Sequence, residues 1–322
     1  MPNWLLNRLF DHGHQPTPRF AFQGTVNWMR ALSMLADSST FSHQMLQRKY
    51  SQVQRRKVNP EADTLVFEML VMSLHNLSSL TSFDMLSAGK YEVVRSAIVA
   101  WYYSTYYASK AMIAACSASN PQTHSKTAKV WQSDIVANGL AVAPFSFMLS
   151  NAVTKTVESE IAALRQSNTH DLNIEPKNSV EARGAAISYL KGTAEYVKWQ
   201  VEEDIKSNRA FRDLNVTNFR SAAARKLRDD RLQQESVNYL VQAFRYRGKA
   251  HYRDSIYLSY GVDQTQVLGT FIGDLRVVAE RFLTMASFYV ARRVEKGTWQ
   301  DFVADINESL NFHIPIDLST IS

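Results

Sequence analysis

The chain has 322 residues, of which 45% are hydrophobic and 20% are charged, and this composition excludes an intrinsically disordered protein. The net charge is +6, and residues 207–253 alone carry eleven basic and four acidic side chains, a net charge of +7. The single cysteine, Cys116, excludes an intrachain disulfide and any zinc site built from several cysteines.

Apolar residues recur at helical spacing along nearly the whole chain. In the first half of the chain we expect a basic-ended segment over 41–56, an apolar helix opened by Pro60 over 62–80, a long helix over 91–118, and loop or short helices over 125–144. In the second half we expect a helix over 145–166, another over 179–206, and a long helix that runs from a cap at 215–218 toward 247. A helix over 263–295 and a short one from 298 complete the pattern. No hairpin signal or internal repeat interrupts the pattern, which therefore predicts an all-α bundle.

The sequence has neither a secretory signal nor an apolar run of the ~20 residues that a membrane-spanning helix needs. We therefore expect a cytoplasmic protein that does not associate with a membrane. We also expect Cys116 to be a small buried residue on a helix, as free cysteines usually are.

The basic stretch over 207–253 allows two interpretations. Positive charge gathered on an otherwise balanced protein is typical of a surface that binds a polyanion such as RNA. The alternative is a solvated helix face with oppositely charged residues four positions apart, such as Lys226 and Asp230. The sequence leaves both open.

The most complete set of reactive groups lies between Arg245 and His251. An arginine can hold a phosphate group, and a histidine can move protons near neutral pH, which together suffice to cut RNA without a metal. The known phosphate-binding loops, dinucleotide fingerprints and paired-histidine zinc motifs are absent from the sequence, so no metal or cofactor is predicted. The alternative interpretation of this run is a basic helix end closed by a histidine.

Two segments of the chain resemble HEPN domains. Residues 91–111, YEVVRSAIVAWYYSTYYASKA, are similar to the first long helix of that family, where an RSA…YY…A.KA pattern is common, and Arg245 and His251 match its R-x4-6-H pattern. The resemblance implies a helical bundle, usually dimeric, in which the arginine and histidine of both subunits meet. Many members are metal-independent ribonucleases in toxin–antitoxin, CRISPR and anti-phage systems, whereas others only bind or scaffold.

Helix geometry adds a second candidate arginine. At about 100° per residue, Arg245 and His251 would lie about 240° apart, whereas Arg247 and His251 would share a face. Gly248 between them can end or distort the helix and so redirect His251. The catalytic residues predicted here are therefore His251 as acid or base, with Arg245 or Arg247 on the phosphate. Further phosphate contacts are expected from five basic residues: Lys249, Arg253, Arg225, Arg228 and Arg231.

The resemblance covers about half of the chain and predicts its organisation. The HEPN-like domain is expected over 86–322 with inserted helices at about 119–206, preceded by an N-terminal helical region over 1–85. Expected partners are RNA, a second copy of the chain, and an antitoxin or operon partner protein. The alternative function is a non-catalytic helical protein that dimerises and binds nucleic acid or another protein through the basic face of 207–253.

Overall fold

A computed structural model of the protein describes residues 4–9, 18–36, 41–166, 168, 170–251, 256, 258, 260 and 263–321. Within these ranges the chain forms helices and loops and no β-strand, which confirms the predicted all-α class. Leu149 and Val237 form one isolated antiparallel bridge.

The helices of the described ranges differ widely in length, and so do the connections between them. Their bounds are α1 Trp4–Leu9, α2 Pro18–Ala36, α3 His43–Tyr50, α4 Pro60–Asp84, α5 Lys90–Ser117, α6 His124–Val130, the π-helix η2 Trp131–Val136, α7 Thr154–Arg165, α8 Ser179–Ser207, α9 Arg209–Arg212, α10 Ala222–Leu232, α11 Tyr239–His251, α12 Thr265–Arg293 and α13 Thr298–Ser309.

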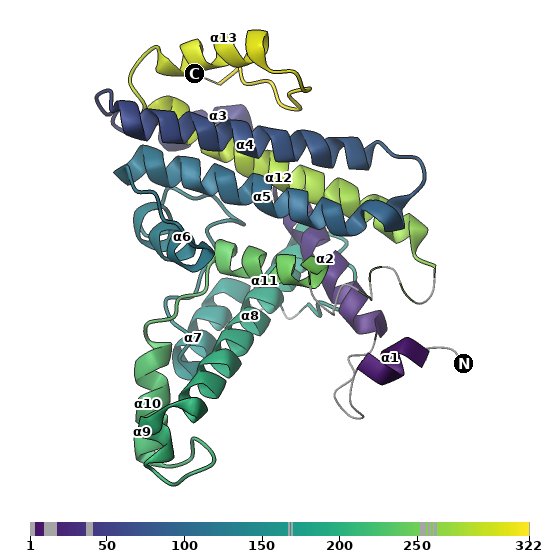
Figure 1. The fold of residues 1–322 in the computed structure, drawn as a ribbon, viewed down its shortest axis with the longest axis vertical. Helices are drawn as coiled ribbons and strands as arrows, with labels where there is room; N and C mark the ends of the chain where they lie inside the picture. The colour runs from purple at the N-terminus through teal and green to yellow at the C-terminus, as the bar shows by residue number, and fades with distance from the viewer. Residues whose placement is uncertain are drawn as a thin grey trace.

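Three long helices form a layer, and helices α7 to α10 form a projection from it that we call the arm (Figure 1). In Figure 1, α4, α5 and α12 run side by side across the molecule, and α13 lies over them. Helices α2, α8 and α11 lie beneath this layer, and α7 to α10 extend away from it. The short helix α11 therefore lies where the layer meets the arm.

Residues at the helix starts determine where two of the long helices begin. Pro60 occupies the first turn of α4, where a missing N–H costs nothing, and Asn59 caps the helix by accepting the N–H of Ala62. Asn178 caps α8 in the same way by accepting the N–H of Glu181. The expected helix over 91–118 is α5, and the one over 263–295 is α12.

Two helix predictions were wrong, and the pairing of the segments around Leu149 and Val237 explains both. The helix predicted from 215–218 toward 247 is two helices, α10 and α11, and the one predicted over 145–166 begins only at Thr154. Residues 145–153 and 233–238 lie outside these helices, and backbone hydrogen bonds join the two segments: the Leu149 N–H donates to the Val237 carbonyl (2.7 Å) and the Ala152 N–H donates to the Leu232 carbonyl (3.1 Å). This pairing takes both segments out of helical geometry.

A cluster of buried aromatic rings joins helices that are distant in sequence. Trp28 of α2 is fully buried, and its ring stacks on Tyr189 of α8 (centroids 4.1 Å apart) and lies 4.7 Å from Tyr246 of α11. Trp101 of α5 meets Trp28 edge-on at 6.0 Å. Buried residues on both sides of residue 85 belong to this one core, and Tyr189 brings the 119–206 segment into it.

Candidate functional site

The start of α11 is fixed by a buried asparagine. Asn238 is fully buried, and its side-chain oxygen accepts the N–H groups of Leu240 (3.0 Å) and Val241 (3.2 Å). Its amide nitrogen donates to the Ala128 carbonyl of α6 at 2.9 Å. This N-cap satisfies the free donors of the first turn and ties α11 to α6.

Tyr246 anchors the middle of α11 and separates the two candidate arginines. Its buried hydroxyl donates to the Thr25 carbonyl of α2 at 2.6 Å. With Tyr246 facing the core, Arg245 and Arg247 leave the helix about 200° apart. The helix continues through Gly248 to His251, so Gly248 does not end it.

Arg245 faces the arm. Its guanidinium carbon lies 4.7 Å from the ring centroid of Tyr196 and 5.6 Å from that of Tyr189, and one nitrogen donates to the Thr193 hydroxyl at 3.1 Å. All three partners belong to α8, so the contacts of Arg245 bind α11 to the arm.

Arg247 faces α5 and sits among aromatic rings. Its guanidinium carbon lies 4.9 Å from the ring centroid of Tyr102 and 5.1 Å from that of Phe244, and it donates to the Tyr103 hydroxyl at 3.0 Å. Its Nε is buried without a hydrogen-bond partner among the described residues. No described carboxylate forms an ion pair with Arg247. The positive charge of Arg247 is therefore not neutralised locally.

His251 is exposed at the end of α11, one turn after Arg247. Partial burial lowers the pKa of this imidazole below its usual value, and the positive charges of Arg247 and Arg95 lower it further. Arg95 of α5 is held there because its Nε donates to the Ala250 carbonyl at 2.9 Å. A histidine with a lowered pKa is mostly neutral at pH 7 and can accept a proton.

A second imidazole completes the surroundings of Arg247. The His124 Nδ1 lies 2.7 Å from the Tyr102 hydroxyl, and its ring stacks on Phe244 with centroids 5.0 Å apart. Burial lowers the pKa of His124, followed by the charges of Arg247 and Lys110. We call Tyr102, Tyr103, His124, Phe244 and Arg247 the Arg247 cluster.

The effect of Arg247 on His251 can be measured directly. In an Arg247→Gln variant we expect the pKa of His251 to rise toward the usual histidine value, because a nearby positive charge has been removed. In Arg245→Gln it should stay as in the wild type, since Arg245 points to α8. Titration of the imidazole Cε1 proton by NMR checks both; equal shifts in the two variants would contradict the geometry described here.

The predicted phosphate contacts on α10 divide into paired and unpaired residues. Arg228 is largely covered and forms ion pairs with Asp229 (2.9 Å) and Glu202 (3.5 Å). Lys226 pairs with Asp230 at 2.7 Å, as the alternative interpretation of a helix face with paired charges had it. Arg225 and Arg231 are exposed, and neither forms an ion pair with a described acidic residue. Arg253 and the side chain of Lys249 lie outside the described residues.

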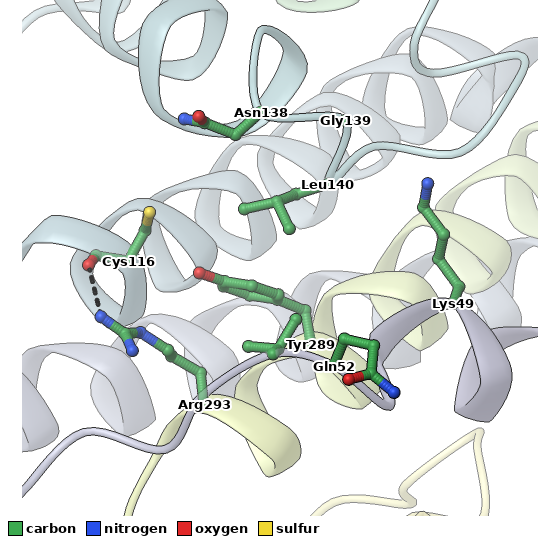
Figure 2. Close-up of a pocket in the computed structure, with 9 residues that line it drawn as sticks. Lys49, Gln52, Cys116, Asn138, Gly139, Leu140, Tyr289 and Arg293 are labelled. Carbon is green, nitrogen blue, oxygen red and sulfur yellow. Dashed lines mark hydrogen bonds between the residues drawn. The ribbon is translucent and has the colours of Figure 1, made fainter.

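A separate cavity of about 390 Å³ lies at the far end of α5 (Figure 2). Cys116 lines it, in the last turn of α5. The predicted position on a helix is confirmed, but the residue packs against the core half-buried and not fully buried. Arg293 reaches the same place, but it donates to the carbonyls of Ala115 (3.2 Å), Cys116 (3.2 Å) and Gln54 (2.7 Å). The guanidinium therefore closes the helix end, about 20 Å along α5 from Tyr103.

Neither a metal site nor a membrane span is found in the described part of the chain. No group of three or more histidine, cysteine or acidic side chains is placed there to hold a metal ion. None of the described helices combines the length and apolar character needed to cross a bilayer. Comparison with protein families, with curated proteins and with solved structures finds no match to this chain.

Sequence reasoning missed three members of this site. Arg95 stands within the HEPN-like segment, yet no role was derived for it, and His124 and Phe244 carried no signal at all. Their part depends on α5, α6 and α11 meeting, which only the fold provides. The four-residue spacing of Arg247 and His251 was the one local clue to the pair.

Proposed function

We propose that the protein is a metal-independent endoribonuclease of the HEPN type, with Arg247 and His251 as its catalytic pair. One observation carries this proposal: an un-neutralised arginine and an imidazole whose pKa it lowers lie one turn apart on the same helix. Aromatic rings hold both arginines, Arg245 against α8 and Arg247 against α5, but only Arg247 shares a helix face with His251 and lowers its pKa. Arg247 is therefore the better candidate for the phosphate.

The proposed reaction uses the RNA's own hydroxyl. The neutral imidazole of His251 takes the proton from a ribose 2′-hydroxyl, and the 2′-oxygen attacks the adjacent phosphorus. Arg247 stabilises the negative charge that builds on the phosphate oxygens. The bond to the 5′-oxygen breaks as that oxygen takes a proton from solvent water, which yields a 2′,3′-cyclic phosphate and a 5′-hydroxyl. The imidazolium of His251 then returns its proton to solvent. DNA lacks the attacking group and is spared.

The resemblance to HEPN proteins also suggests a setting. We propose that the enzyme acts in the cytoplasm as a homodimer, in a toxin–antitoxin or anti-phage system with an antitoxin or operon partner. What supports this part is the resemblance of residues 91–111 and of the Arg245–His251 spacing to HEPN domains, and not the contacts of Arg247.

The experiment that tests the activity uses purified protein with tRNA and total RNA in EDTA. Cleavage should persist without divalent metal, leave cyclic phosphate ends, and fail at a site where the RNA carries a single 2′-deoxy nucleotide. A mock preparation from cells with an empty vector controls for contaminating nuclease. Cleavage that stops in EDTA, or that continues at the 2′-deoxy site, would contradict the mechanism.

A second function rests on the exposed arginines of α10. Arg225 and Arg231 carry unpaired positive charge and favour a binding face for nucleic acid or an acidic partner protein. Binding of this kind weakens steeply with salt. Binding that survives His251→Ala and is lost when Arg225 and Arg231 are both changed to glutamate, in a protein that does not cleave RNA, would favour this function over the first.

A further inference from the structure

A groove begins at the edge of the Arg247 cluster and runs between α6, α8, α10 and α11. Its volume is about 460 Å³, within the range of small-ligand sites. His124 and Phe244 belong both to the Arg247 cluster and to the lining of the groove. Arg247 itself does not line the groove, but its guanidinium carbon lies 5.1 Å from the ring centroid of Phe244, so one side chain separates the groove from the candidate phosphate site.

Two large aromatic side chains line the groove without being buried. Trp199 is 54% exposed and Phe244 is 43% exposed, whereas Trp28, Trp101 and Trp131 are fully buried. Exposed aromatic faces along a surface groove are typical platforms for stacking nucleobases. Trp199 lies on α8, and its ring meets Tyr196 with centroids 5.7 Å apart. The exposed part of the Trp199 ring provides a stacking surface in the groove that His124 and Phe244 also line.

The charges that line the groove favour a base over a phosphate. Three acidic and two basic side chains contribute to it: Glu203, Asp204, Glu235, Lys129 and Arg231. Glu203 pairs with Lys206 (2.7 Å) and Glu235 with Lys129 (3.8 Å), but Asp204 forms no ion pair with a described basic residue. A free carboxylate repels phosphate and accepts hydrogen bonds from an amino group such as the N4 amino group of cytosine.

We propose that this groove binds one unpaired nucleobase next to the phosphate held by Arg247, stacks it on Trp199, and prefers cytosine over uracil through Asp204. Cytosine and uracil have the same size but opposite patterns on one edge: cytosine has an amino donor at position 4 beside the N3 acceptor, and uracil has the O4 acceptor beside an N3–H donor. The preference for cytosine therefore requires that the Asp204 carboxylate meets position 4 of the base, where only cytosine offers a donor. This inference deepens the proposed ribonuclease function by naming the base adjacent to the cut.

The test measures binding without cleavage. Short 2′-O-methyl oligocytidylate and oligouridylate, which lack the attacking hydroxyl, are titrated into the full-length protein and followed by fluorescence anisotropy of a dye on the oligonucleotide. We expect oligocytidylate to bind about tenfold more tightly, Asp204→Asn to remove most of that preference, and Trp199→Ala to weaken both by about tenfold. Trp4→Ala is the matched control, because Trp4 is 53% exposed but lies on α1.

The outcomes separate this inference from the ribonuclease proposal. Equal binding of the two oligonucleotides, or equal effects of Trp199→Ala and Trp4→Ala, overturns the base site even if the wild type cuts RNA. Binding with the expected preference in a protein that cuts no RNA supports the base site and removes the ribonuclease. Circular dichroism of each variant confirms that the exposed substitutions leave the helices intact.

Discussion

Replacing His251 with alanine is expected to lower metal-independent RNA cleavage at least about 100-fold. The substitution removes the proposed proton acceptor while leaving the buried face of α11, including Tyr246, in place. Single-turnover cleavage of a defined RNA in EDTA measures the loss, and thermal unfolding of the same preparation shows whether the fold is kept. Cleavage at the wild-type rate by a folded His251→Ala protein would remove this residue from the mechanism.

The two arginines that flank Tyr246 provide the matched comparison. Arg247→Ala should reduce the cleavage rate by about 100- to 1000-fold, as losing a donor to a developing oxyanion does in other enzymes. Arg245→Ala should change the rate far less, because the contacts of Arg245 are to α8. The reverse result, with only Arg245→Ala inactive, would restore the five-residue spacing of the family pattern and assign Arg247 to packing.

Replacing Trp28 with alanine is expected to lower the free energy of unfolding by about 3–5 kcal/mol. The indole is fully buried at the point where α2, α5, α8 and α11 meet, so its loss leaves a cavity bordered by Tyr189 and Tyr246. Urea unfolding followed by circular dichroism measures the change. Trp4→Ala, which alters an exposed tryptophan on α1, should cost little.

The unfolding of the Trp28→Ala variant also tests whether α2 is an integral part of the helical core. If α2 packed loosely against the remaining helices, they would keep their stability when Trp28 is lost. A loss well below 1 kcal/mol would show that the aromatic cluster is not the centre of the core. A loss of the expected size shows that α2 and the later helices unfold together.

The sequence predicted the elements whose signals are local. Helix α5 was expected over 91–118 because apolar residues recur along it, and α8 was expected from 179 because Ser179 is followed closely by Glu181 and Ala182. The break between α10 and α11 was missed because residue 237 pairs with Leu149, and periodicity within a window of residues does not register a partner so far away. Propensity yields to tertiary contacts of this kind.

The candidate site was predictable in part for the same reason. Helical spacing showed that Arg245 and Arg247 point in different directions and that Arg247 shares a face with His251. Spacing did not show which arginine would be occupied by aromatic rings of α8 and which would lie against α5. That choice follows from the packing of Tyr102, Tyr103 and Tyr196, which is set by the whole fold.

The hydrogen bond from Tyr246 to the Thr25 carbonyl joins residues 221 positions apart. Contacts between such distant parts of a chain cost more loop-closure entropy than local contacts and are typical of slower folding. During translation α2 leaves the ribosome long before α11 does, and so Tyr246 finds its acceptor only when synthesis is well advanced. The directions that Tyr246 gives to Arg245 and Arg247 therefore depend on a segment made more than two hundred residues earlier.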